Sequence, residues 1–149
     1  MSDSTVFIPP ERRPSRAVFI PPLLIVPLVI YNIAALLLMG GNAAGWNGQL
    51  FTIGMVSGQP WALTSGDLLL VLGLACLFFE VLKSTNTGRS SVVEHMLSTL
   101  VFVVFLVEFL LVGAAGSSVF FLLMMMSIFD VVAGFTVSIT SAGRDVTMS

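Results

Sequence analysis

The chain has 149 residues, of which 56% are hydrophobic and only 9% are charged. A typical soluble domain carries about 25% charged residues, and so few charges could not cover the surface of a soluble domain of this size. The mean hydropathy of +1.03 points the same way. These values exclude a soluble fold and predict an all-α integral membrane protein.

The remaining composition excludes several kinds of site. A single cysteine, Cys76, excludes an internal disulfide framework and a metal cluster built on cysteines. A single histidine, His95, excludes haem ligation by two histidines. The net charge of −2 gives no basic surface for a nucleic acid. We therefore expect no cofactor, no metal and no nucleic-acid partner.

The first residues form a polar arm that differs in composition from the rest of the chain. Residues 1–16 contain three prolines and end in a group of basic residues, which are Arg12, Arg13 and Arg16. A residue that precedes proline disfavours the helical conformation, so we expect this arm to be extended and exposed.

Residues 17–39 contain no charge and predict the first membrane-spanning helix, because about 20 apolar residues cross a bilayer. Pro21, Pro22 and Pro27 lie in the first half and predict a kinked or late-starting helix. The alternative is a secretory signal peptide, but the apolar region of such a peptide has only about 7–15 residues. We expect this segment to remain in the mature protein.

The segment 40–64 carries six glycines and no charged residue. Two short stretches in it, 50–56 and 61–64, flank a turn-like Ser-Gly-Gln-Pro sequence and predict a β-hairpin. An uncharged loop with Trp46 and Trp61 suits the headgroup layer, where indole rings prefer to lie. We predict a small external cap that lies on the bilayer.

Three further apolar segments, 66–83, 92–112 and 119–140, predict the remaining helices, and a polar tail, 141–149, follows them. Their uninterrupted apolar runs reach only about 11–13 residues, a length that also suits buried helices of soluble proteins. The lack of a polar face broad enough for water argues against that alternative. Residues 17–140 are therefore predicted to form one membrane domain, a four-transmembrane-helix bundle.

All the basic residues fall on one side of this arrangement. They precede the first helix, flank the turn between the second and third helices, or follow the fourth helix. Cytoplasmic segments carry an excess of Lys and Arg, so both termini and this turn are predicted to be cytoplasmic. The expected membrane is by default the bacterial inner membrane. The six basic residues are Arg12, Arg13, Arg16, Lys83, Arg89 and Arg144.

Small and polar residues recur at helical spacing in the last three predicted helices. Steps of three, four and seven residues place each set on one helix face. Lipid tails gain nothing from such a face, so we expect these faces to pack against other helices. The sets are Gly66, Gly73, Cys76, Glu80 and Lys83; Ser91, Glu94, Ser98, Phe105 and Glu108; and Ser127, Asp130, Gly134, Ser138 and Ser141.

Two acidic residues lie where they would cap the start of a predicted helix. Asp67 follows Thr64 by three residues, and Glu94 follows Ser91 by three residues. In a capping box of this spacing, each side chain bonds to the backbone N–H of the other residue. This interpretation gives both acids a structural role.

Glu80 and His95 lie near the end that we expect to face the cytoplasm. Glu80 is close to a helix C-terminus, where the helix dipole disfavours a carboxylate. Lys83 follows it by three residues and is the expected ion-pair partner, while His95 is the alternative partner across the helices. A histidine in such a place is more often a hydrogen-bonded core residue than a proton relay.

Glu108 and Asp130 lie inside predicted helices, with no cap to form and no basic partner in their own helix. A carboxylate near the bilayer centre costs at least ~2.5–3.5 kcal/mol on insertion scales. Counting about 1.5 Å per residue from the short turns places Asp130 close to the midplane, within a turn or two of Tyr31 and Asn32. We expect a hydrogen bond across the helices, which is either structural or part of proton handling.

Two functions of different classes fit these features. The first is a structural or accessory component of a membrane complex that binds a membrane-protein partner or forms a homo-oligomer. The second is a component of a proton- or cation-coupled transporter or channel, with Asp130, Glu108, Asp67, His95 and Glu80 as the candidate intramembrane site. No nucleophile or phosphate-binding motif indicates an enzyme, and the one acid/base set lacks an evident substrate pocket. That set comprises Glu80, Glu94 and His95.

Overall fold

The computed structural model describes residues 21–85 and 90–147, and it is mostly helical. Within these residues the chain forms four α-helices, two short 3-10 helices and a two-stranded sheet. Three helical segments are long and apolar enough to cross a membrane, which supports the prediction of a helical membrane protein. These segments are Ser65–Ser84, Val93–Leu111 and Ser118–Val137.

The first helix, α1, spans Ile25–Leu37 and begins late, as its prolines predict. Pro27 lies in the first turn, where the N–H that it lacks would have no helical acceptor. The helix has 13 residues and rises about 20 Å, which is less than a hydrocarbon core of about 30 Å. Within the described residues the helix is shorter than the predicted range 17–39, because it begins at Ile25 and ends at Leu37.

The other helices are α2 (Ser65–Ser84), α3 (Ser90–Leu111) and α4 (Ser118–Thr147). They begin and end within about two residues of the predicted bounds, except at the end of α4. There the helix continues to Thr147, into the segment 141–149 that the sequence indicates as a polar tail. No proline interrupts this stretch, and polar residues are compatible with a helix once it leaves an apolar environment.

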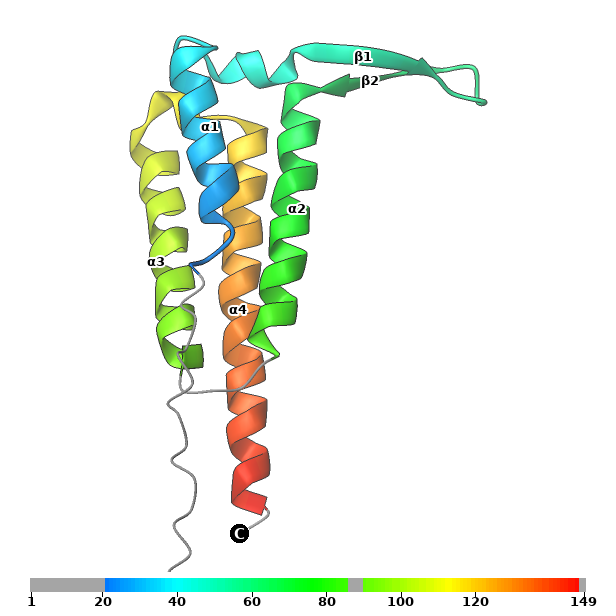
Figure 1. Cartoon of the computed structure of the whole chain (residues 1–149). Coiled ribbons are helices and arrows are strands. Elements are labelled where there is room, and N and C mark those ends of the chain that lie inside the picture. Colours follow the sequence, from blue (N-terminus) through cyan, green and yellow to red (C-terminus); the bar gives the residue numbers. More distant parts are fainter. Residues whose placement is uncertain (1–20, 86–89, 148–149) are drawn as a thin grey trace, which may run out of the picture.

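The segment between α1 and α2 contains the predicted β-hairpin. After the 3-10 helix η1 (Ala43–Asn47), β1 (Gln49–Gly54) pairs antiparallel with β2 (Pro60–Thr64). Gly58 in the connecting turn has a φ of 81°, in the left-handed region that glycine adopts without strain. The hairpin projects crosswise to the helices at one end of the bundle, which we call the hairpin end (Figure 1).

The helices pack around α4, which runs along both α2 and α3 (Figure 1). α1 lies against α2 and α4 in the half of the bundle that is nearer to the hairpin. A second 3-10 helix, η2 (Gly113–Ala115), forms the short turn of small residues between α3 and α4. The C-terminal part of α4 projects from the other end of the bundle, which we call the opposite end.

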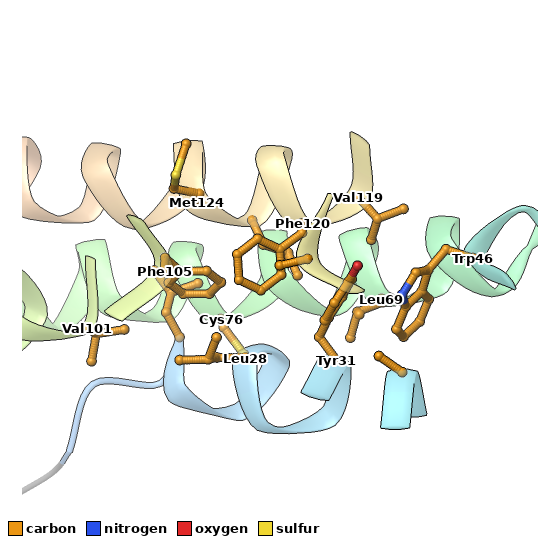
Figure 2. Close-up of a cluster of buried hydrophobic side chains, with 14 residues drawn as sticks. Leu28, Tyr31, Trp46, Leu69, Cys76, Val101, Phe105, Val119, Phe120 and Met124 are labelled. Atoms are coloured by element: carbon orange, nitrogen blue, oxygen red, sulfur yellow. The ribbon is translucent and has the colours of Figure 1, made fainter. Parts of the chain in front are cut away.

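The core of the hairpin half is a column of aromatic side chains (Figure 2). Tyr31, Phe105 and Phe120 are completely buried. The rings of Tyr31 and Phe105 lie 4.7 and 5.3 Å from the ring of Phe120, and Trp46 stacks on Tyr31 at 4.6 Å. We call these four residues the aromatic column; it ties η1, α1, α3 and α4 together.

The predicted small and polar faces of α2 and α4 do pack against other helices. Gly73 and Gly134 are both buried. A β-carbon on Gly73 would lie 2.5 Å from Cδ2 of Leu123, and one on Gly134 would lie 2.4 Å from Nδ1 of His95. Glycine at these two positions therefore allows α4 to approach α2 on one side and α3 on the other.

Candidate functional site

The structure divides the five predicted site residues between the two ends of the bundle. Asp67, at the start of α2, and Glu108, near the end of α3, belong to the hairpin half. Glu80, His95 and Asp130 come together in the other half, where α2, α3 and α4 meet. The predicted residues therefore form two separate sets rather than one continuous row along the bundle.

Asp67 has the capping role that its spacing predicts. Its Oδ2 accepts hydrogen bonds from the backbone N–H and the hydroxyl group of Thr64, at 2.9 and 2.7 Å. The backbone N–H of Asp67 donates in turn to Oγ1 of Thr64 at 3.1 Å. This reciprocal capping box starts α2 where the hairpin ends.

Glu108 is bonded by a neighbouring helix. Nδ2 of Asn32 on α1 donates to Oε2 of Glu108 at 2.8 Å, and it also contacts the carbonyl oxygen of Leu28 at 3.2 Å. The amide thus supplies a donor to a carboxylate that has none in its own helix. This contact joins α1 to α3.

Tyr31 and Asn32, which the sequence places within a turn or two of the depth of Asp130, form hydrogen bonds with other residues. Asn32 bonds Glu108, and the hydroxyl group of Tyr31 donates to the carbonyl oxygen of Ala114, 2.7 Å away. Tyr31 lies within about two turns of the hairpin end of α1, whereas Asp130 lies about three turns along α4.

Glu80 has two partners in the opposite half of the bundle. Its side chain is 2% exposed, and its Oε2 lies 2.9 Å from Nζ of Lys83, which confirms the predicted ion pair. Its Oε1 accepts a hydrogen bond from the backbone N–H of Leu23, just before α1 begins. No side chain caps the start of α1 at Leu24. Glu80 of α2 instead places a negative charge at this end of α1, which is the positive end of the helix dipole.

Asp130 lies next to this pair and is 5% exposed. It forms a side-chain hydrogen bond with Ser98 of α3, whose hydroxyl group is the donor to a carboxylate. Glu80, Lys83 and His95 lie close enough to act on it electrostatically. We call Glu80, Lys83, His95, Ser98 and Asp130 the polar cluster.

His95 is the fourth titratable group of the polar cluster and is 7% exposed. Its ring lies over Gly134, one helical turn beyond Asp130 on α4, and 5.9 Å from the ring of Phe135. The missing side chain at Gly134 provides the space for the imidazole. His95 therefore belongs to the packing interface between α3 and α4.

The polar cluster combines two carboxylates with an ammonium and an imidazole, and these side chains are largely buried. Groups of this kind can hold charge in compensated pairs or pass protons along hydrogen bonds. In the part of the chain that the structure describes, no group of three or more His, Cys, Asp or Glu side chains is placed to hold a metal ion.

Sequence reasoning missed two partners, Ser98 and the backbone of Leu23. Ser98 follows His95 by three residues on the predicted packing face of α3, and that spacing could have placed it in the site. The contact between Leu23 and Glu80 has no local signal, because the two residues are 57 positions apart. Ser91, the predicted capping partner of Glu94, has a side chain outside the described part of the structure.

Comparisons of this chain with protein-family models, with curated proteins and with solved structures gave no match.

Proposed function

We propose that this protein is a structural or accessory component of a membrane complex, a compact helical bundle that binds a membrane-protein partner or a second copy of itself. The observation that carries this proposal concerns Glu108 and Asp130, the acids without a basic partner in their own helix. Each is hydrogen-bonded from a neighbouring helix, by Asn32 and Ser98 respectively. Such bonds lock helices together where apolar packing against lipid cannot.

The aromatic column supports a structural role as well. Phe105 lies between Ser98 and Glu108 along α3, and it is completely buried against Phe120. This apolar layer separates the polar cluster from the pair of Glu108 and Asn32. A hydrated path that used both carboxylates would have to cross it, and such a layer opposes the entry of water.

We also propose that the hairpin end faces the outside of a bacterial inner membrane and that the opposite end faces the cytoplasm. Lys83 and Arg144 lie in the parts of α2 and α4 farthest from the hairpin, whereas segment 40–64 carries no charge. The contact between Leu23 and Glu80 supports a fourth crossing, because it places the residues just before α1 beside the last turns of α2.

A second candidate function is a proton- or cation-coupled transporter or channel component. The polar cluster favours it, because Glu80, His95 and Asp130 gather where α1 begins inside the bundle. Helices that begin or break at membrane depth beside acidic residues are typical of ion sites in transporters. Under this alternative Asp130 would exchange a proton instead of holding a permanent hydrogen bond.

The Asp130→Asn substitution separates the two functions. An amide is isosteric with the carboxyl group and still accepts the hydrogen bond from Ser98, so a structural role predicts stability within about 1 kcal/mol of wild type. Extraction of native membranes in mild detergent, followed by native gels, should then give the same complex for both proteins. A proton-coupled role predicts instead that flux into proteoliposomes containing a pH-sensitive dye disappears in the variant.

The matched control is Glu108→Gln, which makes the same chemical change at the acid outside the polar cluster. We expect neither wild type nor the two variants to carry protons above the level of empty liposomes. Flux that depends on Asp130 but not on Glu108 would overturn the structural proposal in favour of transport. Migration of the wild-type protein as a lone monomer in every mild detergent would also count against it.

A further inference from the structure

The β-hairpin is amphipathic, with one apolar face and one face of small or polar residues. Directly opposite residues of an antiparallel pair point to the same side of the sheet, and successive residues alternate. Phe51 pairs with Leu63, and Ile53 pairs with Trp61, so these four side chains share one face. The intervening pairs, Thr52 with Ala62 and Gly54 with Pro60, form the other face.

Most of the apolar face is not covered by the protein. Leu63, at the base of the hairpin, is buried, but Phe51, Ile53 and Trp61 each leave about half of their surface exposed. At the tip, Val56 is fully exposed. A two-stranded hairpin alone is marginally stable in water and needs an apolar partner for its face. The hairpin projects away from the helices, so this partner must come from outside the bundle (Figure 1).

The position and composition of the hairpin point to lipid as that partner. β2 runs directly into α2 at Ser65, the first residue of a candidate membrane span, so the hairpin lies at the depth where the span ends. Leu68 and Val71, in the first turns of α2, also leave about half or more of their surface exposed. The interfacial layer of a bilayer accepts apolar side chains and favours tryptophan. It also tolerates the uncharged polar face, which remains toward water.

We propose that the hairpin lays its apolar face, formed by Phe51, Ile53 and Trp61, into the interfacial layer of the leaflet at the hairpin end. The hairpin then extends the footprint of the protein in one leaflet well beyond its helices. This inference does not depend on the function proposed above, because an accessory protein and a transporter would both retain the contact.

The two tryptophans make the proposal directly testable. The Trp46→Phe variant leaves Trp61 as the sole tryptophan and keeps an aromatic ring next to Tyr31. In phosphatidylcholine vesicles with bromine near the top of the acyl chains, Trp61 emission should fall roughly twofold, while aqueous iodide should have little effect. The reciprocal Trp61→Phe variant reports Trp46, which is 4% exposed, and its emission should resist both quenchers. If Trp46→Phe fails to fold, the difference between wild type and Trp61→Phe gives the same signal.

Two neighbouring substitutions test which face contacts lipid. Ile53→Lys puts a charge on the apolar face and should remove most of the quenching of Trp61 by brominated lipid. Thr52→Lys puts the same charge on the other face and should leave the quenching unchanged. Strong quenching of Trp61 by iodide would overturn the proposal and place the face in water. Protection from both quenchers would also overturn it, since it would indicate that another protein or a second copy covers the face.

Discussion

The two halves of the bundle hold their acidic residues in different ways. In the hairpin half, Asp67 and Glu108 each bond to one nearby uncharged residue, so each carboxylate forms an independent contact. In the opposite half, Glu80 and Asp130 belong to one cluster in which a change at either acid affects the other. The acids of one small helical protein can therefore belong to separate sets of contacts.

Removal of Glu80 should produce the largest effect of any single change in the bundle. Glu80→Ala removes the carboxylate that pairs with Lys83 and the acceptor of the N–H of Leu23. Loss of one partner of a buried ion pair costs about 3–5 kcal/mol. We expect the lower part of that range, because the longer Lys83 side chain can reach toward the interface. Thermal unfolding in detergent measures the loss.

The conservative variant Glu80→Gln separates the two contacts of this side chain. The amide oxygen still accepts from Leu23, but the charge opposite Lys83 is lost, so the loss of stability should be smaller than in Glu80→Ala. Equal losses in the two variants would show that the bond to α1 contributes nothing. A wild-type melting curve for Glu80→Ala would contradict the distinction between the two halves.

The Gly134→Ala substitution should cause the next largest loss of stability, because it crowds the ring of His95 where α3 packs against α4. The added β-carbon would lie 2.4 Å from Nδ1 of His95, so the imidazole or the helix must move. Forced overpacking of this kind costs about 1–3 kcal/mol. Gly113→Ala is the matched control, since a β-carbon there meets nothing within 4 Å.

The double variant His95→Ala with Gly134→Ala identifies the cause of that loss. If the methyl group collides with the imidazole, Gly134→Ala should cost much less in the His95→Ala background than in wild type. Thermal melting of the four proteins in one detergent gives the coupling between the two positions. Additive losses would show that the strain at Gly134 arises elsewhere.

Sequence reasoning succeeded in this protein wherever the partners are close along the chain. Glu80 with Lys83 and Asp67 with Thr64 follow from a three-residue spacing, which a helix or its cap brings together by geometry alone. The hairpin followed from glycines and a turn sequence between two short apolar stretches. The bounds of α2 and α3 and the start of α4 were predicted within about two residues, because apolar runs determine which segments enter a bilayer.

The same reasoning failed where depth depends on how far a helix extends. The partner of Glu108 lies 76 residues away, and counting along the predicted helices placed Asn32 near the depth of Asp130 without indicating its bond to Glu108. The prolines predicted a late start but not the residue at which α1 begins, because the contact of Leu23 with Glu80 lies between distant segments. The division of the acids into two sets was therefore visible only in three dimensions.

The pair of Asn32 and Glu108 should give the smallest effect and the sharpest test of independence. Asn32→Leu removes the amide donor, and interhelical hydrogen bonds in membranes contribute about 0.6 kcal/mol on average. A double-mutant cycle with Glu108→Leu measures the coupling in thermal unfolding, and the double variant should recover most of the loss because no polar group remains unpaired. The same cycle between Asn32→Leu and Asp130→Asn should give no coupling, because the aromatic column separates the pair of Asn32 and Glu108 from Asp130. A measurable coupling there would show that the two halves act as one site, which is the behaviour that a conducting path requires.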